Sequence, residues 1–273
     1  MDYEKLMQDA RKKISKITFN SEVEILKAYR VASFIIMKKI KENQKRGLEI
    51  EYYQNVNDEL EEVVSILNNR LSDSIKKSII SVSDVITDVQ LIFNSEVFPV
   101  NIAETANNYI KGRNMRLVQT LISGEYYKDS KSLDTRIWNI TNKNKNDIQT
   151  LIASNIAKGV NSRELAKVID NYVNPTTRTQ AKTVVSGMSR NISYQAQRLA
   201  RTSITQTANE ANRESAKENV FCQGLKWNLS SSHYERQIKR WGPDICDVYA
   251  NQNNYNLGQG VFPIEEYPIS HPN

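Results

Sequence analysis

The stretch at residues 57–94, NDELEEVVSILNNRLSDSIKKSIISVSDVITDVQLIFN, decides the fold class of this 273-residue chain. Its apolar residues recur every three or four positions, the spacing that places side chains on one face of an α-helix. No glycine or proline interrupts it, so it predicts one long helix or a helical hairpin that turns near Ser72. The apolar face could serve a coiled coil, but we expect it to pack against other helices of the same chain. It consists of Leu60, Val64, Leu67, Leu71, Ile75, Ile79, Val82, Val85, Val89 and Ile92.

The flanking sequence continues the helical pattern. Residues 2–45 predict one or two helices, and the run from Ala28 to Met37 is apolar on nearly all sides, which calls for a covering partner. Phe98-Pro99 breaks the pattern, and residues 102–122 resume it. The chain has only 9 Gly and 6 Pro, a composition that argues against a turn-rich β protein.

The second half predicts shorter helices. After a polar loop at 124–132, one short helix ends at Lys143-Asn144-Lys145-Asn146 and another covers 147–157. Asn161, with Glu164 three residues on, predicts an N-capped helix. Residues 179–220 predict a long helix weakened at Gly187.

A small mixed element closes the chain. Apolar and polar side chains alternate over residues 225–229, which predicts a strand, and 248–250 is the candidate partner strand. The expected fold is mainly α, with long N-terminal helices followed by a helical unit and a small C-terminal α+β subdomain. The expected domains are an elongated partner-binding region at 1–125, a helical unit at 133–220 and the subdomain at 221–273.

Charge is distributed in blocks along the chain. Residues 47–110 carry 3 basic and 11 acidic groups, whereas residues 111–240 carry 22 basic and 10 acidic groups. The basic block could face a polyanion or simply form a solvated helical surface. Within it, Lys143, Lys145 and Lys158 are the candidate DNA contacts. The acidic block suits a basic protein partner better than DNA.

The sequence predicts a cytosolic product. Its two cysteines, Cys222 and Cys246, do not make a disulfide framework. The start, Met1-Asp2-Tyr3-Glu4, lacks the features of a signal peptide. The apolar run 31–37 is too short to span a bilayer.

Candidate metal ligands lie near the C-terminus. His233, Cys246 and His271 are the candidate zinc ligands, together with Cys222, and Asp244 or Asp247 could add an oxygen. Spacings of 13 and 25 residues match no compact zinc motif, and Cys246 could instead pack as a small hydrophobe. We therefore expect no cofactor and keep zinc as the open alternative.

Catalysis is not expected. A nucleophilic Cys246 would need a thiolate and an oriented base, whereas its neighbours Asp244 and Asp247 would raise the pKa of its thiol. The chain also has no phosphate-cradling glycine loop and no nucleophile elbow.

Four further residues have expected structural roles. Arg198 and Arg201 lie one helical turn apart and could contact phosphate or anchor the following strand through its backbone carbonyls. We favour the anchor, because the guanidinium fork suits fixed geometry. Trp227 and Trp241 flank the C-terminal segment and are expected to supply much of its core.

The order of these features resembles the Mu F-like minor head proteins of tailed bacteriophages. The resemblance covers residues 145–273, but Ser203 stands where the family usually has an acidic residue. The family commonly continues past the equivalent of Asn273 with a Cys-x-Cys pair, so we expect the encoded chain to extend further. The matching pieces are Ala200-Arg201-Thr202, Asn209, Asn212, Lys226-Trp227, Asp244-x-Cys246-Asp247, Phe262-Pro263 and His271-Pro272.

The resemblance implies a structural protein of the virion. Such a protein would lie inside the head at the portal vertex, after assembly in the bacterial cytoplasm. Its expected partner is the portal protein, with packaged double-stranded DNA and the major capsid or scaffold protein as further candidates. The alternatives are a carrier of a C-terminal toxin or enzyme domain absent from this chain, and a non-specific DNA-binding protein.

Overall fold

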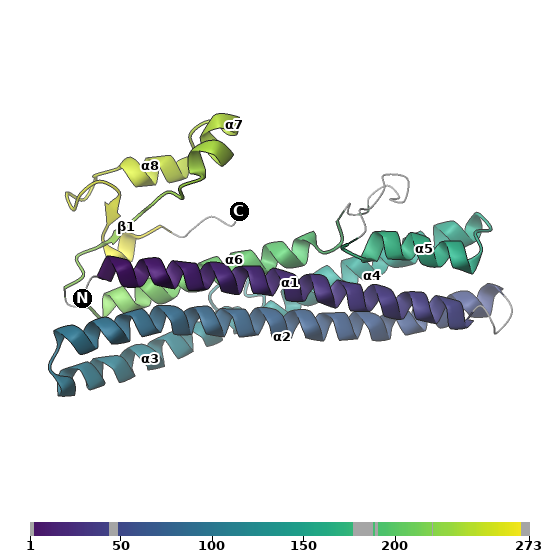
Figure 1. The fold of residues 1–273 in the computed structure, drawn as a ribbon, viewed down its shortest axis with the longest axis horizontal. Helices are drawn as coiled ribbons and strands as arrows, with labels where there is room; N and C mark the ends of the chain where they lie inside the picture. Colours follow the sequence, from purple (N-terminus) through teal and green to yellow (C-terminus); the bar gives the residue numbers. More distant parts are fainter. Residues whose placement is uncertain (1–2, 44–48, 177–187, 189–190, 220, 269–273) are drawn as a thin grey trace. The chain divides into compact units, whose positions relative to one another are not determined.

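The structure is a computed structural model that describes residues 3–43, 49–176, 188, 191–219 and 221–268. Its secondary structure is mainly α-helical, with one two-stranded sheet near the C-terminus (Figure 1). This confirms the fold class that the sequence predicts. In chain order the long helices are α1 (Tyr3–Asn43), α2 (Glu49–Val97), α3 (Val100–Ser123), α4 (Leu133–Ala157), α5 (Ser162–Val173) and α6 (Tyr194–Lys217).

Short elements follow the last long helix. They are β1 (Leu225–Lys226), the π-helical turn η2 (Tyr234–Ile238), α7 (Lys239–Trp241), α8 (Ile245–Asn251), β2 (Val261–Phe262) and the 3-10 turn η3 (Ile264–Glu266). No helix among the described residues combines the length and the apolar content needed to cross a bilayer.

The stretch that decides the fold class forms a single helix, so the hairpin alternative is wrong. Ser72 is buried within α2, and its hydroxyl donates a 2.6 Å hydrogen bond to Asp134 on α4. A polar residue at this position therefore marks an interhelical contact rather than a turn. The break at Phe98-Pro99 is confirmed, because α2 ends at Val97 and α3 begins at Val100.

The predicted interruption at residues 143–146 is also wrong, because α4 is continuous through it. Asn144 lies inside the core, where its side-chain amide donates a 2.6 Å hydrogen bond to the Tyr29 hydroxyl of α1. The predicted cap of the next helix is confirmed, since Asn161 accepts a hydrogen bond from the Glu164 backbone N–H.

The chain forms two compact units, which we describe separately. The bundle unit comprises Arg11–Val82 and Val118–Ile204, and the terminal unit comprises Met1–Ala10, Ser83–Leu117 and Thr205–Pro272. These units do not follow the sequential ranges 1–125, 133–220 and 221–273, because each one combines segments that are distant in sequence.

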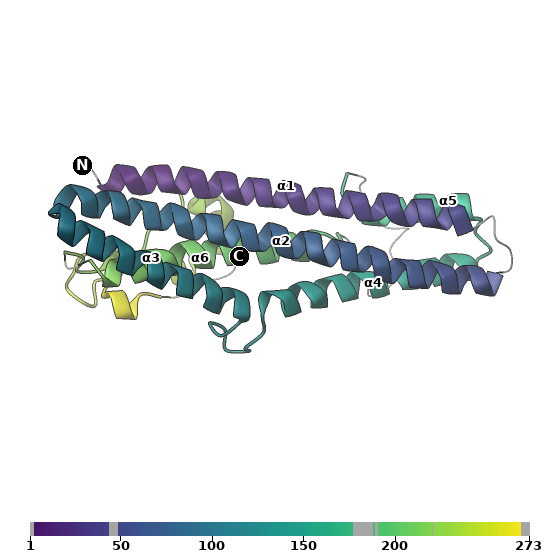
Figure 2. The same ribbon diagram turned by 90° about the horizontal axis from the view of Figure 1, so that it is seen from below.

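The bundle unit has a continuous apolar core. Within this unit α1 and α2 lie side by side in both views (Figures 1 and 2). Buried polar bonds tie the helices together. Tyr172 donates its hydroxyl to Asp147 at 3.0 Å, and Ser33 donates to Asp170 at 2.9 Å. The core includes Ile25, Tyr29, Ile40, Leu71, Ile75, Ile79, Ile137, Leu151, Ile152, Ile169 and Tyr172.

The terminal unit joins the end of α2 to α3 and α6 by polar contacts. Asn114 of α3 is buried and donates to Thr87 of α2 at 2.7 Å, and to Ser215 of α6 at 3.4 Å. Arg113 forms ion pairs with Glu214 of α6 and with Glu218, which follows the end of that helix. These bonds fix the three helices against one another where few large apolar side chains are available.

The C-terminal part of this unit is a small subdomain built on the sheet. Strands β1 and β2 pair antiparallel, with Leu225 opposite Phe262. The expected partner strand at 248–250 is instead part of α8, so that pairing prediction is wrong. Asp244 and Asp247 form a capping box there, and a capped turn favours a helix over a strand.

An aromatic cluster forms the core of the subdomain. The Trp227 ring centroid lies 5.3 Å from that of Tyr249 and 5.6 Å from that of Tyr267, and Phe262 contacts both tyrosines. The expectation for Trp241 is wrong, because its side chain is 79% exposed. Trp241 is the last residue of the short helix α7. Its ring contacts none of the aromatic rings of this cluster in the described part of the chain.

Candidate functional site

The N-terminus of α8 places two carboxylates next to each other. The Asp244 side chain accepts the Cys246 backbone N–H at 2.9 Å, and the Asp247 side chain accepts the Asp244 backbone N–H at 2.8 Å. This reciprocal pair is a capping box, which satisfies N–H groups that a helix start leaves without partners. The sequence therefore fixes the positions of both carboxylates through local hydrogen bonds.

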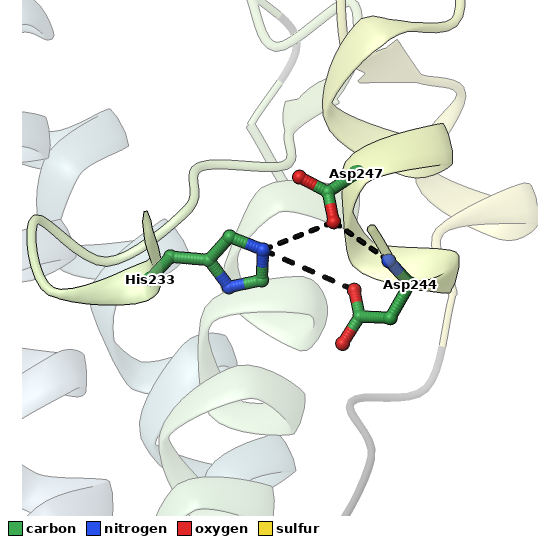
Figure 3. Close-up of side chains that lie close together, drawn as sticks. All are labelled: His233, Asp244 and Asp247. Carbon is green, nitrogen blue, oxygen red and sulfur yellow. Dashed lines mark hydrogen bonds and ion pairs between the residues drawn. The ribbon is translucent and has the colours of Figure 1, made fainter. Parts of the chain in front are cut away.

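An imidazole faces these carboxylates from an earlier turn. His233 precedes η2, and its Nε2 lies 3.1 Å from Asp247 Oδ2 and 4.0 Å from Asp244 Oδ1. Figure 3 shows the ring directed at both aspartates. The His233 and Asp247 side chains are each 14% exposed, and Asp244 is 35% exposed. We call these three residues the His-Asp-Asp cluster.

The surroundings shift the pKa values of Asp247 and Cys246 in opposite directions. The Asp244 backbone N–H and then the His233 ring lower the pKa of Asp247 below its ordinary value. The pKa of the Cys246 thiol is raised, first by burial and then by Asp244 and Asp247. A thiol in this environment stays protonated, which makes Cys246 a poor nucleophile and a poor metal ligand.

The structure regroups the predicted zinc ligands. His233 lies with Asp244 and Asp247, and these three are the described residues whose ligand atoms gather within 4.8 Å of one another. Cys246 is not in that group although it lies between the two aspartates in sequence. The Cys222 thiol contacts the Gly224 carbonyl at 3.4 Å, and His271 lies outside the described residues.

The two arginines were expected to anchor the following strand, and that expectation stays a prediction because the strand belongs to the terminal unit. Within the bundle unit, Arg201 is exposed on α6 and forms an ion pair with the Glu22 carboxylate of α1. Arg198 is exposed on the same helix.

Two of the three candidate DNA contacts are paired with carboxylates. Lys143 lies 3.3 Å from Asp147 on the same helix, and Lys145 lies 3.0 Å from Glu61 of α2. Lys158 follows the end of α4 and is exposed. Of these two pairs, Lys145 with Glu61 joins the basic block to the acidic block within the bundle unit.

A polar groove between α1 and α2 was not predicted from the sequence. It has a volume of about 440 Å³, and its lining includes Ser21 and Glu24 from α1 and Arg70, Ser74 and Ser81 from α2. The Ser21 hydroxyl is buried in this lining and has no hydrogen-bond partner among the described residues. Ser74, Ser78 and Ser81 at helical spacing on α2 were the available signal, but only the pairing of α1 with α2 brings Ser21 next to them.

Comparison of the chain with protein-family models, with curated proteins and with solved structures gives no match.

Proposed function

We propose that this chain is a structural minor head protein of a tailed bacteriophage, located inside the virion at the portal vertex. The observation that supports this most is where the family-like motifs lie. Lys226-Trp227, the Asp244–Asp247 turn and Phe262-Pro263 are separated in sequence, yet they make up one small subdomain with a shared aromatic core. Motifs that resemble a family in order and also fold together are better explained by common ancestry than by chance.

A non-catalytic role accords with the chemistry of the C-terminal segment. The Cys246 thiol has a raised pKa, and the His233 imidazole contacts the Asp247 carboxylate. That arrangement holds a turn against α8. We therefore propose a structural and assembly role, in head assembly and in DNA packaging or ejection.

The portal is the proposed partner, and residues 1–110 are the proposed contact region. The polar groove between α1 and α2 lies within this region, and polar and charged side chains that include Glu24 and Arg70 line it. On α3, Ile102 and Tyr109 are half-exposed beside a second hollow. Exposed apolar side chains beside a hollow favour a protein partner.

The test is co-purification with the portal protein encoded by the same phage genome. The full chain should retain the portal, and Ser81→Trp, which fills the groove, should lower the recovery at least tenfold. Ser65→Trp is the matched control, because Ser65 is exposed on the same helix outside the groove lining. Failure of the wild-type chain to retain the portal, together with its absence from purified virions, would refute the proposed function. Equal recovery with both variants would refute only the groove as the contact.

Packaged DNA is a second candidate partner. If the basic block contacts DNA, binding should be independent of sequence and should weaken steeply with salt. Because Lys143 and Lys145 are already paired, Lys158→Glu should reduce affinity for every duplex more than Lys143→Glu does. Binding that survives high salt, or that depends on one sequence, would contradict this role.

A further inference from the structure

We propose that the His-Asp-Asp cluster binds one divalent transition-metal ion, for which zinc is the reference ion. This proposal does not rest on the proposed function. The cluster offers one imidazole nitrogen and two carboxylate oxygens, all within 4.8 Å of one another. Such mixed nitrogen and oxygen sets, with a position left for water, are typical of open zinc sites and of other first-row metals.

The geometry is close to what coordination requires. Zinc bonds to nitrogen and oxygen of about 2.0–2.2 Å place two tetrahedral ligand atoms roughly 3.4 Å apart. His233 Nε2 lies 3.1 Å from Asp247 Oδ2 and 4.0 Å from Asp244 Oδ1. The longer separation involves Asp244, the most exposed of the three side chains.

Charge provides an independent indication of a cation. Within the described part of the chain, no lysine or arginine nitrogen lies within 4.0 Å of either Asp244 or Asp247. With a neutral His233, the cluster therefore holds two negative charges with no basic side chain to balance them. Partly buried charges are normally paired or bound to a metal. One divalent ion would bring the site to neutrality.

The hydrogen bonds around the cluster leave the required ligand positions open. Each carboxylate oxygen that faces His233 accepts one backbone N–H, and a carboxylate oxygen has a second lone pair for a metal. These N–H groups also hold both carboxylates in place, as outer-shell bonds do in metal sites. Cys246 contributes only its backbone N–H, so the site is a nitrogen and oxygen site and not a thiolate site.

The test measures binding of Zn²⁺ and Co²⁺ to the full chain, freed of metal beforehand, by calorimetry and visible spectroscopy. We expect one equivalent to bind, and a Co²⁺ spectrum without a thiolate-to-metal charge-transfer band. His233→Ala, Asp244→Asn and Asp247→Asn should each lower the affinity at least tenfold. Asparagine keeps the capping hydrogen bonds, so these two variants should fold.

Matched variants separate this site from others. His271→Ala, Cys246→Ser and the distant Asp88→Asn should all bind as the wild type does. A thiolate band that disappears in Cys246→Ser would overturn the proposed ligand set. Absence of binding at one equivalent, or full affinity in His233→Ala, would overturn the site itself.

Discussion

Truncation of Trp227 should loosen the C-terminal subdomain, whereas truncation of Trp241 should not. The sequence predicts that both tryptophans lie in the core of the subdomain, yet only Trp227 contacts the rings of Tyr249 and Tyr267. Removal of a fully buried aromatic side chain costs roughly 3–5 kcal/mol. Because Trp227 is only partly buried, we expect Trp227→Ala to cost about 2–3 kcal/mol, including its aromatic pair contacts. Trp241→Ala should change stability by no more than about 0.5 kcal/mol.

Hydrogen exchange is the suitable assay, because it reports on the subdomain separately from the rest of the chain. The residue 227 backbone N–H bonds to the Gly260 carbonyl at 2.8 Å and persists in the alanine variant. A loss of about 2–3 kcal/mol should lower protection of this amide and its neighbours in β2 by about 30- to 150-fold. Equal changes in the two variants, within a factor of two, would refute the aromatic core described above.

Three further predictions concern the core, the sheet and pH. Tyr29→Phe removes the acceptor for the buried Asn144 amide, so it should lower the free energy of unfolding by about 1–3 kcal/mol in urea titrations. Tyr194→Phe is its control, because Tyr194 is 46% exposed, and equal effects would contradict the buried bond. Gly260→Ala should destabilise the subdomain more than Gly159→Ala in limited proteolysis. Both have positive φ, but a Cβ at 260 would lie 2.7 Å from the Ala250 carbonyl and one at 159 meets open space. The pKa of Asp247 is lowered in the folded chain, so its contribution is present above the unfolded pKa of about 3.9 and is lost as pH falls through the folded value. Melting of Asp247→Asn should accordingly vary less with pH below about 4 than melting of the wild type, and parallel curves would contradict this.

The sequence by itself determined the mainly helical fold class and some of the helix ends. The apolar repeat in α2 and the Phe98-Pro99 break act through neighbours a few residues apart, so they could be interpreted without the fold. The Asn161 cap is equally local. Prediction from neighbouring residues fails where a polar side chain forms a hydrogen bond with a residue that is distant in sequence. Asn144 and its neighbours look like a helix end, but the Tyr29 hydroxyl satisfies the Asn144 amide inside the core.

Only the tertiary structure decided what the C-terminal residues do. Trp227 and Trp241 have the same local character, and burial by Tyr249 and Tyr267 separates them. Asp244 and Asp247 are a short-range cap that the sequence could have revealed, since their spacing matches a capping box. His233 lies 14 residues before Asp247, and no periodicity links them. Their contact depends on how the turn before η2 packs against α8, because chain distance sets no limit on which side chains a fold brings together.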